Sequence, residues 1–210
     1  MPKRCGGISL RSFRHNGRRY TPVIGNIFQP SNLTNLINME IIEPKKLKQL
    51  LDLVYSAHQE HNTRKDFRQN GKVPFIVHPI WCALTILNDQ RIPFEERELG
   101  YQVLLLHDIL EDTSLEIPDF VDRKVLEFVK EMTHETWEEE QNIENKSDFI
   151  KLLKLCDKIA SMYDETVRSE PQRRKEWKIL TSKLLNDVEN HYGNIRLVTL
   201  AKAVLNDSDW

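Results

Sequence analysis

The spacing of apolar residues along the chain is the feature that most limits its fold. From Pro44 onward, apolar side chains recur every three or four residues, first at Leu47, Leu50, Leu51, Val54 and Ala57. That spacing places them on one face of an α-helix. Alternating apolar and polar residues, which are typical of strands, are nearly absent after residue 40. The pattern predicts an all-α domain over residues 41–210.

The same spacing predicts further helices along the domain. They span residues 78–88, 93–110, 117–132, 148–167 and 171–193. The segment 93–110 is apolar nearly all round toward its end, so we expect it to be the central buried helix. Pro79 suits a first helical position, where its missing N–H has no partner to lose. A polar loop is expected over residues 62–72.

Residues 1–40 differ from the rest of the chain in charge. Up to residue 39 they contain six basic residues and no acid, whereas the remaining 24 basic and 32 acidic residues give −8. We expect a solvated extension with irregular structure or a short hairpin, because pairs such as Asn16-Gly17 favour turns. Contact with nucleic acid and a mitochondrial transit role remain open alternatives for this extension.

Composition narrows the class of protein. A chain of 210 residues with 40% hydrophobic and 30% charged residues suits one packed domain. The longest aliphatic run, residues 103–106, is far shorter than the roughly 18 apolar residues of a membrane span, so no membrane partner is expected. An odd number of cysteines without paired spacing favours a reducing compartment, and the cytoplasm is our expectation. Nothing in the sequence specifies an oligomeric state.

Four ionisable side chains lie close together in the most apolar predicted helix. His107 and Asp108 are followed by Glu111 and Asp112. Burying such groups is costly unless they are paired or bind a metal. Asp108 lies three and four residues before the other two acids, so the carboxylates repel one another on neighbouring helix faces. A divalent cation would relieve that repulsion.

Two other predicted helices carry side chains of the same kind. His78 begins one, and Asp157 lies within an apolar stretch of another. Two imidazoles and two carboxylates suit manganese, iron or zinc better than calcium. The alternative is structural: His78 is then an ordinary core or surface histidine, and Asp157 pairs with Lys154, with Lys158 or with a neighbouring helix.

Three short segments carry a family resemblance. They are residues 74–79 (P-F-I-V-H-P), 104–113 (L-L-L-H-D-I-L-E-D-T) and 154–158 (K-L-C-D-K). They are similar to the P-Y-I-x-H-P, A-L-L-H-D-x-x-E-D-T and K-L-A-D-R motifs of the RelA/SpoT-type (p)ppGpp hydrolases, within the HD superfamily of metal-dependent phosphohydrolases. The resemblance covers about residues 47–165, and H-D-x-x-E-D-T is its most specific part.

The resemblance implies a helical HD domain that holds one Mn²⁺ ion through His78, His107, Asp108 and Asp157. Glu111 and Asp112 would serve hydrolysis. The implied reaction is release of pyrophosphate from the 3′ position of ppGpp, a small-molecule nucleotide, by attack of metal-bound hydroxide. The long bifunctional members also have a synthetase domain, for which this chain has no room, so we expect a stand-alone hydrolase.

Predicted substrate contacts are basic. Arg64, Lys65 and Arg68 precede the first histidine motif, and Lys158 follows the last ligand. Lys158 stands where the family has arginine, and Ser161 where it has asparagine. These departures concern nucleotide specificity more than the metal site. A nucleotidase, an NADPH-type phosphatase of the same superfamily and a non-catalytic nucleotide-binding regulatory module remain alternatives.

Overall fold

The computed structural model describes residues 14–15, 18–19, 43–60, 67–68, 73–163 and 171–207. The chain divides into two units, Met1–Ile41 and Ile42–Trp210. In the first unit, the two-residue strands β1 (Arg14–His15) and β2 (Arg18–Arg19) pair antiparallel. This is the short hairpin that the Asn16-Gly17 pair favours. The other residues of the predicted 1–40 extension lie outside the described residues.

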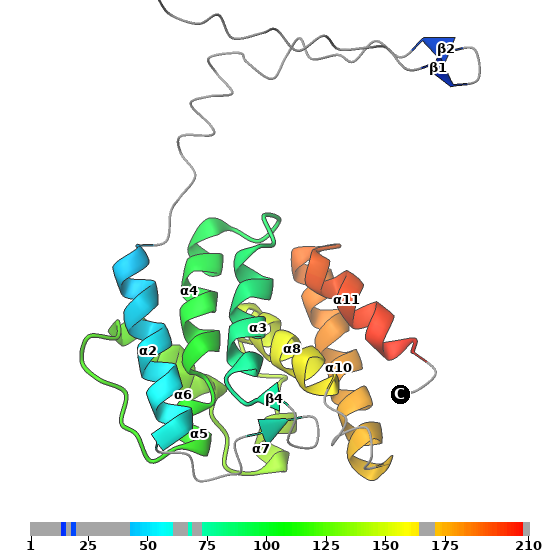
Figure 1. The fold of residues 1–210 in the computed structure, drawn as a ribbon. Helices are drawn as coiled ribbons and strands as arrows, with labels where there is room; N and C mark the ends of the chain where they lie inside the picture. Colours follow the sequence, from blue (N-terminus) through cyan, green and yellow to red (C-terminus); the bar gives the residue numbers. More distant parts are fainter. Residues whose placement is uncertain are drawn as a thin grey trace, which may run out of the picture. The chain divides into compact units, whose positions relative to one another are not determined.

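The described part of the second unit is helical, as predicted. Its helices are α2 (Pro44–Glu60), α3 (Val77–Leu87), α4 (Phe94–Leu106), α5 (Ile109–Asp112), α6 (Arg123–Met132), α7 (Trp137–Gln141), α8 (Asp148–Met162), α10 (Pro171–Tyr192) and α11 (Arg196–Leu205) (Figure 1). Within the predicted polar loop, β3 (Phe67–Arg68) begins a minimal antiparallel hairpin with β4 (Val73–Pro74). Among the described residues, no helix is both long and apolar enough to cross a bilayer.

The core is built around two helices, α4 and α8, rather than around one. α4 packs against α2, α3 and α6, and α8 packs against α3, α10 and α11 (Figure 1). Every residue of α8 from Leu152 to Ile159 is buried, as is α4 from Gly100 to Leu106. The prediction of a single central helix was therefore incomplete, because α8 is covered on several sides by its neighbours.

The break between α4 and α5 corrects the predicted helix 93–110. α4 ends at Leu106, and His107 and Asp108 form a turn before α5. The Nδ1 atom of His107 lies 2.8 Å from the carbonyl oxygen of Leu104. A helix that continued would use that oxygen to accept from a backbone N–H one turn later, so the imidazole competes with the helix at this point.

Other helix ends also differ from the prediction. α6 begins at Arg123 instead of residue 117, because the Asp122 side chain accepts a 2.7 Å hydrogen bond from Lys124 N and caps the helix there. Pro79 is the third residue of α3, still in the first turn, where N–H groups have no helical acceptor. α8 ends at Met162, and residues 164–170 lie outside the described residues. The spacing of apolar residues did not predict α7 and α11.

Candidate metal centre

Two imidazoles and a carboxylate from three parts of the chain converge beside α3. His78 lies in the first turn of α3, His107 follows α4, and Asp157 lies in α8. The two Nε2 atoms are 3.3 Å apart. Oδ1 of Asp157 lies 3.1 Å from Nε2 of His78 and 3.6 Å from that of His107. These ligand atoms all lie within 4.8 Å of one another.

Asp108 completes the set of four side chains that the sequence singled out. Its Oδ1 lies 3.2 Å from Nε2 of His107, and its Oδ2 lies 3.5 Å from Nε2 of His78. Both carboxylates therefore face the same pair of imidazole nitrogens. The structure brings together all four predicted ligands, although they come from distant positions in the sequence.

The donor set fits a divalent cation. Ligand atoms at about 2.1 Å from one ion lie roughly 3.0–3.4 Å from their neighbours, which is close to the observed spacing. The contact of His107 Nδ1 with Leu104 O assigns the ring proton to Nδ1 and leaves Nε2 as a donor for a metal. The His/His/Asp cluster can therefore hold a divalent metal.

Electrostatics at the cluster favour added positive charge. Burial opposes protonation of His107, but Asp108 and Asp157 outweigh burial and raise its pKa to about 9. Burial also disfavours the charged form of Asp157, yet Lys158 and the two histidines hold its pKa well below the ordinary value. The Asp157 carboxylate thus stays ionised in a largely desolvated site, where a cation is stabilised.

Two cysteines pack beside the cluster. Cys82 Sγ lies 4.0 Å from Nδ1 of His78, and Cys156 Sγ donates to the carbonyl oxygen of Cys82 at 3.5 Å. Both side chains are fully buried. Burial and the neighbouring thiol raise the pKa of Cys82 well above its usual value, so this thiol stays protonated. Both cysteines therefore serve core packing.

The two acids predicted to serve hydrolysis lie in α5, one turn beyond the cluster. Glu111 Oε1 accepts a 3.0 Å hydrogen bond from the backbone N–H of His134 and lies 3.1 Å from its Nδ1. Asp112 is buried, with 5% of its surface exposed. Glu111 is thus held by a residue that the sequence analysis left without a role.

A chain of ionic contacts that the sequence analysis missed joins Glu111 to Asp157. His134 Nε2 lies 3.2 Å from Oε2 of Glu140. Glu140 also pairs with Lys158, whose Nζ lies 3.1 Å from Oδ2 of Asp157. Glu140 is the only buried residue of α7. The sequence shows three consecutive glutamates at residues 138–140, but it does not show which of them points inward.

Of the four predicted substrate contacts, the structure describes the side chain of Lys158 alone. Arg64 and Lys65 lie outside the described residues, and Arg68 lies in β3 with its side chain outside the description. The ammonium of Lys158 is buried and lies 4.8 Å from the ring centroid of Trp177. Burial opposes its charge, but Asp157 and Glu140 raise the pKa of Lys158 above its ordinary value.

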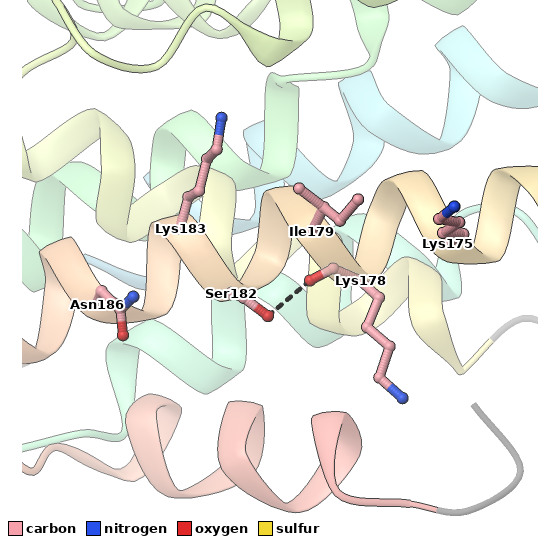
Figure 2. Close-up of a pocket in the computed structure, with 6 residues that line it drawn as sticks. All are labelled: Lys175, Lys178, Ile179, Ser182, Lys183 and Asn186. Atoms are coloured by element: carbon pink, nitrogen blue, oxygen red, sulfur yellow. Dashed lines mark hydrogen bonds between the residues drawn. The ribbon is translucent and has the colours of Figure 1, made fainter.

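Two surface pockets lie away from the four clustered side chains. One, on the outer face of α10, is lined by Lys175, Lys178, Ile179, Ser182, Lys183 and Asn186 (Figure 2). The second is lined by Glu131, Thr133, His134, Glu139, Asn142, Lys146 and Lys154. Only the second includes a residue of the ionic chain, His134. In the first, Ser182 Oγ donates to the carbonyl oxygen of Lys178 at 2.7 Å (Figure 2).

Comparison with solved structures finds a related fold. One match is described in the words "A metazoan ortholog of SpoT hydrolyzes ppGpp and plays a role in starvation responses". The TM-score is 0.59 at 19% sequence identity, over 78% of this chain and 96% of that chain. No family matches the chain by sequence, and no curated protein does. The predicted all-α helical bundle is confirmed, and the chain shares its fold with this SpoT ortholog.

Proposed function

We propose that this chain is a metal-dependent phosphohydrolase. The observation that carries the proposal is the convergence of His78, His107, Asp108 and Asp157. It gains support from the fold shared with the SpoT ortholog, which is described as hydrolysing ppGpp. A cluster of two imidazoles and two carboxylates, of which all but the partly exposed Asp108 are buried, is costly to maintain without a bound cation. A purely structural role explains it less well.

We assign cation binding and proton transfer to different side chains of the site. The four clustered residues would hold a divalent ion. When bound, a divalent cation lowers the pKa of a water ligand and supplies a nucleophile near neutral pH. Glu111, which His134 contacts through its backbone N–H and Nδ1 atom, would orient a nucleophilic water or accept its proton. Asp112, buried beside it in α5, assists in the same step.

The substrate that we propose is ppGpp, from which pyrophosphate leaves the ribose 3′ position, with Mn²⁺ as the metal and the cytoplasm as the compartment. The H-D-x-x-E-D-T segment at residues 107–113 and the description of the SpoT ortholog support this substrate. Arg64, Lys65 and Arg68 would contact its phosphates, because a polyanion needs cationic partners.

A second nucleotide substrate is favoured by one observation. Lys158 stands at the family's arginine position, and its ammonium is engaged by Asp157 and Glu140 inside the protein. Ser161, at the family's asparagine position, donates to Oδ1 of Asp157 at 3.4 Å. Since both side chains face Asp157, nucleotide contacts differ from those of the family, and a nucleotidase or an NADPH-type phosphatase is the second candidate.

A product assay separates these reactions. The purified protein, with its bound metal quantified, is supplied with Mn²⁺ and tested on ppGpp, pppGpp, nucleoside monophosphates and NADPH. Pyrophosphate released from ppGpp supports the first substrate, and orthophosphate from the other nucleotides supports the second. If no nucleotide is turned over with any divalent metal, the enzymatic proposal is wrong, and a binding module is the better account.

A further inference from the structure

The Glu111 carboxylate is fixed by a residue from a different part of the chain. His134 follows α6, 23 positions later in the sequence, and contacts Oε1 of Glu111 through both its backbone N–H and its Nδ1 atom. Two donors from one residue converge on a single oxygen atom. Such an arrangement limits the rotation of the Glu111 side chain.

His134 is fixed in turn on its other side. Its Nε2 lies 3.2 Å from Oε2 of Glu140, and Lys158 pairs with the remaining oxygen of Glu140. Burial opposes the imidazolium, but Glu111 and Glu140 outweigh it and raise the pKa of His134 to about 9. Both ring nitrogens therefore carry protons at neutral pH, and each donates to a carboxylate.

The side chains in this chain of ionic contacts alternate in charge. The contacts run from Asp157 through Lys158, Glu140 and His134 to Glu111. The side chains of Glu140 and Lys158 are each only 6% exposed. Buried ionic contacts of this kind are weak contributors to stability because desolvation offsets much of their attraction. These contacts are better explained by a positioning role, in which they fix the Glu111 carboxylate at one end of the chain of ionic contacts.

We propose that His134 is a positioning residue, held by Glu140, that fixes the Glu111 carboxylate beside the metal centre. This inference rests on the proposed hydrolase function and on the role of Glu111 in it. Replacement of His134 by alanine should lower kcat by about 10- to 100-fold, the range typical for groups that orient catalytic side chains. Metal content and KM should change little, because His134 contacts none of the four clustered residues in the contacts described.

Two amide variants separate the contacts of His134. In His134→Asn, the new amide has its nitrogen where Nδ1 was and can still donate to Glu111. His134→Gln has its amide nitrogen where Nε2 was and can still donate to Glu140. If His134 acts through Glu111, His134→Asn should retain more of kcat than His134→Gln. Equal kcat in the two variants, or a higher kcat for His134→Gln, would overturn the inference.

A double-mutant cycle tests whether the two residues act as a unit. In a Glu111→Gln background, His134→Ala should cause no further loss of kcat. Losses that multiply would overturn the inference. His191→Ala is the matched control, because His191 pairs with Asp148 at 2.9 Å on the surface with half of its side chain exposed.

A measurement without turnover keeps the inference separate from the proposed function. In ¹⁵N NMR spectra of the metal-free protein, Glu111→Gln should shift the Nδ1–H signal of His134, and Glu140→Gln its Nε2–H signal. If neither signal responds, the contacts are absent and the inference is wrong. If both N–H signals respond but the native protein turns over no nucleotide, the proposed function is wrong. The positioning role of His134 is then wrong as well, because it rests on that function.

Discussion

At the scale of single residues, burial and charge act on the clustered side chains in opposite directions. Burial disfavours charge on both His107 and Asp157, yet the neighbouring carboxylates raise the pKa of His107, and Lys158 with the two histidines lowers the pKa of Asp157. Removing one partner leaves the other buried without compensation. Each member of the cluster is therefore needed for the charge state of the rest.

Loss of one ligand should abolish metal retention and turnover together. We expect His107→Ala or Asp157→Ala to weaken metal binding by more than about 100-fold, since even groups that only orient ligands contribute about 10- to 100-fold. Metal analysis after gel filtration, together with the nucleotide assay, measures both effects. His191→Ala should retain full metal content. Normal metal content in His107→Ala would show that this imidazole is not a ligand.

His134 makes stability depend on pH in a defined direction. Although burial opposes its charge, the pKa in the folded state is about 9, above about 6.5 in an unfolded chain. A raised pKa gives stabilisation that is complete below the unfolded value and is lost as pH rises through the folded value. The free energy of unfolding of the native protein relative to His134→Gln should thus shrink between about pH 6.5 and 9. Urea denaturation across this pH range measures the difference in unfolding free energy between the two proteins. A difference that grows with pH would contradict the raised pKa of His134.

At the scale of elements, short helices and turns do the positioning. α7 is only five residues long, yet it carries Glu140 inward. Its N-terminus is capped by the Thr136 side chain, which accepts from Glu139 N at 3.2 Å. The long helices supply the core, and this short one directs the carboxylate that holds His134.

Loss of the α7 cap should affect activity as well as stability. We expect Thr136→Ala to lower the free energy of unfolding by about 1 kcal/mol and to lower kcat, because Glu140 lies in the capped helix. Ser147→Ala is the matched control: Ser147 accepts from Ile150 N at the same 3.2 Å but caps the long helix α8. Urea denaturation measures the free energy of unfolding of each variant, and steady-state kinetics measure its kcat. Equal loss of kcat in the two variants would argue against a positioning role for α7.

At the scale of the whole molecule, the close approach of α4 to α3 and α8 depends on a glycine. A Cβ atom at Gly100 would lie 3.0 Å from Cγ2 of Ile86 and 3.2 Å from Cδ2 of Leu153. Because the ligands come from these helices and the turn after α4, their packing distance sets the separation of the metal-binding atoms.

Gly100→Ala should therefore destabilise the protein. Alanine favours the helix by up to about 1 kcal/mol, but overpacking a buried contact costs about 1–3 kcal/mol, so a net loss of about 1 kcal/mol is expected. Thermal and urea denaturation measure it, with exposed Lys175→Ala as a control near zero. A more stable Gly100→Ala variant would mean that Ile86 and Leu153 move aside without cost.

The helices that the sequence predicted well are those with clear ends and long apolar stripes. α10 begins at Pro171 and ends at Tyr192, just before Gly193 with a φ of 70°, as the residue types indicate. The predicted end of α4 and the predicted start of α6 were wrong, because hydrogen bonds made by the side chains of His107 and Asp122 set them. Periodicity records which face is buried and carries little information about such contacts.

The sequence by itself determined the helical class, the apolar faces and the identity of four candidate ligands, because these depend on local spacing and residue type. Only the tertiary structure decided that Glu140, among three consecutive glutamates, faces inward, and that His134 lies against Glu111. It also decided that Lys158 pairs with buried acids. Those contacts join residues far apart in the chain, and their geometry follows from how α5, α7 and α8 pack, which no single segment encodes.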